Sequence, residues 1–136
     1  MNRTRAFRLL LVGALMTIAL AACSGGGAAA AITPPPEADL TITAERGSFE
    51  PSEIAAPAGT SFEMFFRNLD PAPHNVSIFT DASVSESRFV GGVITDASTV
   101  YRVPALEAGS YFFRCDVHPE MTGTLVARFP EADLRR

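Results

Sequence analysis

Short runs of residues that alternate between apolar and polar, or that are largely apolar, recur along the chain and are separated by turn residues. Residues 40–44 (LTITA) alternate, and residues 60–70 (TSFEMFFRNLD) are rich in phenylalanine. Both patterns are typical of β-strands. Residues 81–90 show neither pattern clearly, and a loop or a short helix fits them equally well. Further strands are predicted at 74–79, 93–95, 100–103, 110–114 and 122–129.

Several short strands at this spacing, without an amphipathic helix, predict an all-β domain built as a β-sandwich or a barrel. The composition agrees, because Gly, Pro and Phe number ten each and Trp is absent. That balance is closer to turn-rich β proteins than to helical bundles. A length of 136 residues suits one small domain with terminal segments. The breaker at 70–73 (DPAP) should place His74 at or just before the start of a strand.

The first 22 residues have the features of a signal peptide. Arginines at positions 3, 5 and 8 precede an uncharged apolar stretch, 9–22, which is shorter than the roughly 20 residues of a bilayer-spanning helix. The tetrapeptide 20–23 (LAAC) resembles the lipobox of bacterial lipoproteins, which implies a lipid on Cys23, the first residue of the mature protein. In the alternative, Cys23 is a small residue near an ordinary cleavage site. A lipid on Cys23 would anchor the exported protein to a membrane, in the periplasm or on the outer face of the cell.

Residues 23–38 are predicted to form a tether, because Gly, Ala and Pro offer little apolar surface to bury. The folded domain is then expected at 39–136. Loss of the signal peptide leaves eight of the eleven basic residues against fifteen acidic ones, so the formal charge of the mature chain is −7. We expect no nucleic-acid partner, since phosphate binding needs a surplus of basic side chains. An acidic chain would instead attract a basic patch on a protein partner.

Three residues with metal-binding side chains are spaced three apart in the segment CDVHPEM, near the end of the chain. Cys115, His118 and Met121 lie between two predicted strands, so they share one hairpin loop. If Cys23 carries a lipid, Cys115 has no disulfide partner, and a free thiol in an oxidising compartment needs another role. Thiolate, imidazole and thioether together suit a copper ion that cycles between Cu(I) and Cu(II).

The chain contains one other histidine, His74. In a sandwich, the strand beside His74 can be a neighbour of the strand that carries Cys115. Two imidazoles and one thiolate then form a trigonal set for one copper ion, with a thioether as the weak axial fourth ligand. Zinc also binds His and Cys, but a thioether is a poor zinc ligand and favours copper. The predicted metal ligands are His74, Cys115, His118 and Met121.

With these residues in view, the chain resembles the cupredoxins, the small type 1 blue copper proteins that include plastocyanin and amicyanin. The resemblance rests on residues 49–79, which contain Asn68, His74 and Asn75, and on residues 101–127. The second segment has the pattern Tyr-x-Phe-x-Cys-x-x-His-Pro, and its Cys-x-x-His-x-x-Met spacing is the short, amicyanin-like form. The resemblance implies a Greek-key sandwich of about eight strands and a role in one-electron transfer. It also implies transient contact with redox partners, near a membrane or in the periplasm. The acidic charge of the mature chain would attract a basic patch on such a partner, for instance on a cytochrome or an oxidase subunit.

The resemblance implies roles for residues beside the ligands as well. Asn75 would tie the two ligand-bearing loops together near the thiolate sulfur and so orient the ligands. In the alternative, Asn75 is only a turn residue before a strand. His118, followed by Pro119 and facing residues 71–73, would reach an apolar surface patch for docking and electron exit. Glu120 either sits in solvent or lowers the reduction potential.

Two other classes of function fit less well. A copper-binding lipoprotein could deliver copper to an oxidase, but delivery sites tend to be exposed and rich in Met or His. The mature part of the chain has only two methionines, Met64 and Met121. An enzyme is disfavoured, because a site with four protein ligands leaves no open position for a substrate. We therefore predict a monomeric electron carrier that is not an enzyme.

Overall fold

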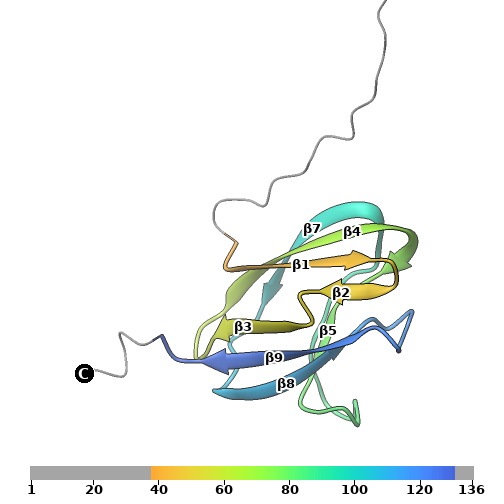
Figure 1. Ribbon diagram of the computed structural model, residues 1–136. Helices are drawn as coiled ribbons and strands as arrows, with labels where there is room; N and C mark the ends of the chain where they lie inside the picture. Colours follow the sequence, from red (N-terminus) through yellow and green to blue (C-terminus); the bar gives the residue numbers. More distant parts are fainter. Residues whose placement is uncertain (1–37, 131–136) are drawn as a thin grey trace, which may run out of the picture. The chain divides into compact units, whose positions relative to one another are not determined.

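The computed structural model of the protein describes residues 38–130 (Figure 1). The predicted signal peptide and the predicted lipidation site, Cys23, lie outside the described residues. Between residues 38 and 130 there is no helix of the length and apolar character needed to cross a membrane. The described residues form nine strands: β1 (Leu40–Glu45), β2 (Ser48–Glu50), β3 (Glu53–Pro57), β4 (Phe62–His74), β5 (Ser77–Phe79), β6 (Ser87–Val90), β7 (Ile94–Val103), β8 (Gly109–Arg114) and β9 (Thr122–Arg128).

The strands build two sheets. One sheet has the order β2-β1-β4-β7 and the other the order β3-β9-β8-β5-β6. In Figure 1, β1, β4 and β7 of the first sheet lie above β3, β9 and β8 of the second. β1 pairs with β4 in parallel and β3 pairs with β9 in parallel, whereas the other neighbours are antiparallel. The predicted all-β Greek-key sandwich is confirmed.

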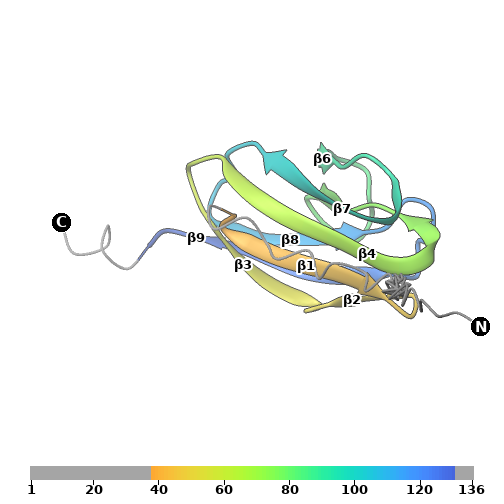
Figure 2. The ribbon, with the colours of Figure 1, turned by 90° about the horizontal axis from the view of Figure 1, so that it is seen from above.

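The phenylalanine-rich strand β4 supplies the centre of the core between the sheets. Phe62, Met64 and Phe66 alternate along β4 and are almost completely buried, because successive side chains of a strand point to opposite faces. Rings from both sheets meet in this core, and the centroid of Phe49 in β2 lies 5.4 Å from that of Phe113 in β8. β4 and β7 run side by side for most of their length (Figure 2). The close packing holds the ends of the two sheets in a fixed relation.

Three segments differ from the prediction. The short strands β2 and β3 are not foreseen, since each has only three to five residues and Pro51 separates them. The stretch 81–90 contains a turn and then β6 rather than a helix. The strands predicted at 93–95 and 100–103 are one strand, β7, because the polar residues between them continue the ladder with β4.

His74 also lies differently from the prediction. It is the last residue of β4, and the next strand, β5, begins only at Ser77. The breaker does not end β4, because the pairing of β1 with β4 stops at Asn68 and leaves one edge of β4 free beyond that point. The register with β7 shifts between Asn68 and Pro73, and a proline is tolerated at such an irregularity. β4 therefore carries His74 past the bulge to the end of the sandwich.

Candidate metal centre

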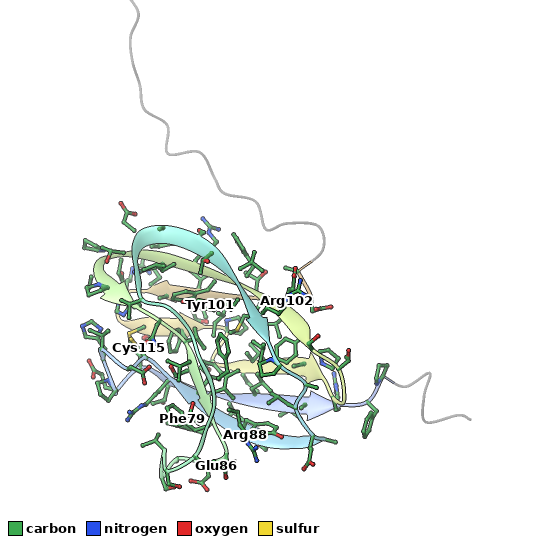
Figure 3. All side chains as sticks on the ribbon, turned by 180° about the vertical axis from the view of Figure 1, so that it is seen from behind. Phe79, Glu86, Arg88, Tyr101, Arg102 and Cys115 are labelled. Carbon is green, nitrogen blue, oxygen red and sulfur yellow. The ribbon has the colours of Figure 1, made fainter. Side chains whose placement is uncertain are left out.

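The loop between β8 and β9 holds three of the four predicted ligands. It starts directly after the pair Arg114–Thr122, which closes the ladder between the two strands. The Cys115 amide donates to the Met121 carbonyl over 3.0 Å, and the Met121 amide donates to the His118 carbonyl over 2.9 Å. The predicted hairpin loop at 115–121 is thus confirmed, and its own backbone hydrogen bonds hold its shape. Figure 3 shows Cys115 at one end of the sandwich.

Three donor atoms converge at this end. Nδ1 of His74 lies 3.7 Å from Sγ of Cys115, Nδ1 of His118 lies 4.0 Å from the same sulfur, and the two nitrogens are 3.1 Å apart. These sides define an acute triangle, so the point equidistant from its corners lies inside it. That point lies about 2.1 Å from each of the three atoms, as the product of the sides divided by four times the area of the triangle gives. For comparison, zinc binds imidazole and thiolate at about 2.0–2.3 Å. The three donors are therefore spaced closely enough that they would hold one metal ion between them.

His74 and the loop that carries Cys115 and His118 come from opposite sheets. His74 ends β4 of the four-stranded sheet, whereas Cys115 follows β8 of the five-stranded sheet. The strand that neighbours β8 is β5, where Ser77 pairs with Arg114. The predicted neighbourhood is therefore correct for β5, the strand after His74, because β5 pairs with β8, the strand that leads to Cys115. His74 itself belongs to β4 and faces the Cys115 thiol from the other sheet.

The site is shielded from water on most sides. Cys115 is 0% exposed, His74 1% and Met121 2%, and Cys115 is the free cysteine of the described residues. His118 is half-buried, and Glu120 next to Met121 is exposed to solvent. Of the four predicted ligands, His118 is thus the one that is partly accessible to solvent. Of the two alternatives for Glu120, the structure favours the solvated one.

Asn75 joins the segment of His74 to the ligand loop. Its Oδ1 accepts a hydrogen bond from the Asp116 amide at 2.8 Å, and its Nδ2 donates to the Asp116 carboxylate at 2.8 Å and to the Gly91 carbonyl at 2.9 Å. Ser77 Oγ donates to the same carboxylate at 2.5 Å. Asn75 is 1% exposed. It is therefore a buried cross-link between two ligand-bearing segments and more than a turn residue.

A carboxylate that the sequence interpretation misses contacts His74 on its other side. Nε2 of His74 lies 3.1 Å from Oδ2 of Asp70, whose side chain is 15% exposed. The Arg46 and Gly47 amides donate to the two Asp70 oxygens at 2.8 and 3.0 Å. The Gly47 amide in particular holds the pKa of Asp70 below its ordinary value; the Arg46 amide and His74 act in the same direction, and partial burial opposes them. Asp70 is thus an anion at neutral pH.

Local spacing could not have revealed this contact. In a regular strand, residues four apart are separated by about 13 Å, too far for the side chains of Asp and His to meet. The irregular stretch of β4 between Asn68 and Pro73 shortens that path. Asn68 supports it, because Nδ2 donates to the Ala72 carbonyl at 2.7 Å and to the Ile94 carbonyl at 2.9 Å.

Comparison with known proteins assigns the chain to a family. Residues 11–127 match the family model of the cupredoxin-like domain. The chain belongs to this family of copper-binding β-sandwiches. The chain is similar to amicyanin from Paracoccus versutus, with 30% identity over 87 residues that cover 64% of this chain and 63% of that protein. The chain therefore matches less than two thirds of the length of this relative.

Solved structures agree on the fold. The crystal structure of amicyanin from Paracoccus versutus (Thiobacillus versutus) superposes with a TM-score of 0.55 and 30% identity, over 69% of this chain and 84% of amicyanin. Dithionite-reduced auracyanin from the photosynthetic bacterium Roseiflexus castenholzii gives a TM-score of 0.57, over 65% of this chain and 95% of auracyanin. At 15% identity, the likeness to auracyanin concerns the fold alone.

One copper ion is the cofactor that family membership and the donor set indicate together. Two imidazole nitrogens and a thiol sulfur surround a point at metal-binding distance, and the side chain of Met121 is buried in the same loop. Soft sulfur donors beside imidazoles suit copper better than magnesium, calcium or manganese, which prefer oxygen.

Proposed function

We propose that the protein is a type 1 copper electron-transfer protein rather than an enzyme. The observation that carries the proposal is the triangle of donors, in which Nδ1 of His74, Sγ of Cys115 and Nδ1 of His118 surround one point at about 2.1 Å. Met121 would be the weak fourth ligand of the ion. Copper, when bound, supplies a one-electron couple between Cu(II) and Cu(I).

The chain's own residues would make electron transfer to and from the copper ion fast. The packed sandwich presets the positions of the donors, and the backbone bonds of the loop and the Asn75 cross-link keep them in place. If the ligands barely move between the Cu(II) and Cu(I) states, little energy is needed to rearrange the site during electron transfer. Burial of Cys115 and His74 excludes the water that would otherwise reorient around the changing charge.

Burial also favours electron transfer over copper delivery. A delivery site must release its ion to a partner, yet here Cys115 is 0% exposed and His74 is 1% exposed. An enzyme would need an open position for a substrate, and four protein ligands leave none.

Spectroscopy of the copper-loaded protein tests the proposal. We expect an intense visible band from the Cu(II)–thiolate bond, which a reductant bleaches and an oxidant restores. Cys115→Ser should remove the band. A weak, pale Cu(II) spectrum would contradict the proposal, and rapid loss of copper to an apo acceptor would favour delivery instead.

The proposed role of Met121 as fourth ligand has a matched control in the chain itself. Met121 and Met64 are both almost completely buried, but Met64 lies on β4 in the core. We expect Met121→Leu to change the reduction potential and the visible spectrum, whereas Met64→Leu should leave both unchanged. Equal spectra and potentials for the two variants would remove Met121 from the ligand set.

His118 is the proposed route of electron exit. It is half-buried, and exposed side chains lie on the two segments that carry the ligands: Pro71, Pro73, Val117 and Pro119. Exposed apolar side chains suit brief contact with a redox partner, and Asp116 and Glu120 add negative charge to the same loop. In His118→Gly refilled with imidazole, copper should return but electron exchange with a partner should slow. An unchanged exchange rate would place the exit elsewhere.

Location and partners follow from the leader and the charge. We propose that a lipid on Cys23 holds the mature protein on the extracytoplasmic side of a membrane, where a basic patch on a cytochrome or an oxidase subunit would attract its acidic surface. Cys23→Ser should move the exported protein from the membrane fraction to the soluble fraction. Unchanged fractionation of this variant would refute the lipid anchor.

A further inference from the structure

We propose that Asp70 is a positioning residue for the copper site, which fixes the orientation of His74 and biases the bound ion toward Cu(II). The inference rests on the proposed copper function and deepens it.

The two nitrogens of His74 face in different directions. Nδ1 faces Cys115 and His118, whereas Nε2 lies 3.1 Å from Oδ2 of Asp70. A neutral imidazole that binds a metal through Nδ1 carries its proton on Nε2, so Nε2 donates to the carboxylate. A carboxylate in this position fixes the tautomer and the ring orientation of a ligating histidine and makes it a stronger donor.

Asp70 is itself held in place by a distant turn. Arg46 and Gly47 connect β1 to β2, and both have positive φ, 53° and 71°. A two-residue hairpin turn of this kind is a type I′ turn. Its two amides donate to the two oxygens of Asp70 at 2.8 and 3.0 Å, which makes a small anion-binding site of the backbone. The β1–β2 turn thus positions His74 through Asp70, independently of the β8–β9 loop.

The charge of Asp70 should act on the redox couple. The side chain of His74 is 1% exposed and that of Asp70 is 15% exposed, so water screens their interaction weakly. Within residues 38–130, no arginine forms an ion pair with Asp70, and the Arg46 guanidinium instead lies 3.4 Å from Glu45. The anionic thiolate and the carboxylate together balance the two charges of Cu(II), but they leave an excess negative charge with Cu(I). Asp70 therefore stabilises Cu(II) relative to Cu(I).

The matched pair Asp70→Asn and Asp81→Asn tests this inference. Each substitution removes one negative charge with little change of shape, but Asp81 follows the end of β5 that is distant from Cys115. For Asp70→Asn we expect Cu(II) affinity to fall by about 10–100-fold, as loss of such outer partners typically does. Cu(I) affinity should fall at least tenfold less, because the lost carboxylate charge balances Cu(II) and not Cu(I). Tenfold corresponds to a rise in reduction potential of about 59 mV for a one-electron couple. Asp81→Asn should match the parent protein.

Voltammetry and competitive copper titration measure these quantities. If the parent protein shows the reversible visible band but Asp70→Asn and Asp81→Asn have equal potentials and affinities, the inference about Asp70 fails while the proposed function stands. If the parent protein itself lacks the band, both fail.

A measurement on the unsubstituted protein decides the case if Asp70→Asn does not fold. In the Cu(I)-loaded protein, ¹⁵N NMR should show the His74 proton on Nε2 with slow exchange against solvent, as expected of a buried hydrogen bond to a carboxylate. Rapid exchange of that proton, or a proton on Nδ1, would overturn the inference.

Discussion

Asn75→Ala should lower the free energy of unfolding of the copper-free protein substantially, because Asn75 makes buried hydrogen bonds that join the His74 segment to the β8–β9 loop. The Gly91 carbonyl loses its donor, the Asp116 amide loses its acceptor, and the Asp116 carboxylate loses one of two donors. A buried polar group without a partner costs about 1–3 kcal/mol, and the partly exposed Asp116 groups should cost less because water can replace Asn75. We therefore expect the free energy of unfolding to fall by about 2–4 kcal/mol. For a domain near 100 residues, this lowers Tm by at least about 8 °C.

Urea unfolding of the copper-free protein measures this difference without interference from metal binding. Ser77→Ala is the matched control, since it removes one hydrogen bond to the same Asp116 carboxylate, whose side chain is 35% exposed and can bind water instead. That change should cost about 0.5–1.5 kcal/mol. If Asn75→Ala costs no more than Ser77→Ala, Asn75 is not the cross-link described above. If both variants unfold alike but Asn75→Ala alone alters the Cu(II) spectrum, the role of Asn75 concerns the metal and not the fold.

Two further predictions concern packing and pH. An alanine at Gly123 would press its Cβ into the ring of Phe113, so Gly123→Ala should lower the free energy of unfolding by about 1–3 kcal/mol or more. Gly92 has open space around it, so Gly92→Ala should leave the free energy of unfolding unchanged. Equal stability of the two variants in urea would contradict this packing. The side chain and amide of Ser83 hold the pKa of Asp81 below 3.8, so the contribution of Asp81 to stability is present above pH 3.8 and is lost as the pH falls through the lower folded pKa. NMR titration of Ser83→Ala should find the Asp81 pKa closer to 3.8, and an unchanged value would show that the hydroxyl has no part in the shift.

Periodicity and spacing along the chain were sufficient to predict the class of fold and the ligand loop. β1, β8 and β9 lie close to their predicted positions, because an apolar face that alternates with a polar one is buried in only one register. The loop between Cys115 and Met121 is equally local, since its ends are set by the two strands of one hairpin. The donor types also follow from the residues alone, because thiol, imidazole and thioether chemistry does not depend on the fold.

The tertiary structure decided the parts of the site that depend on contacts between distant segments. His74 reaches Cys115 from the opposite sheet, and Asp70 reaches His74 because β4 is irregular between Asn68 and Pro73. Local spacing predicts neither contact. His74 and Cys115 are far apart in the chain, and a regular strand would separate residues four apart, such as Asp70 and His74, by about 13 Å. The sequence by itself determines which chemical groups the protein can offer and which face of each strand is buried. The packing of two sheets decides which groups meet, because distances between residues far apart in the chain are set by the whole core and not by any one segment.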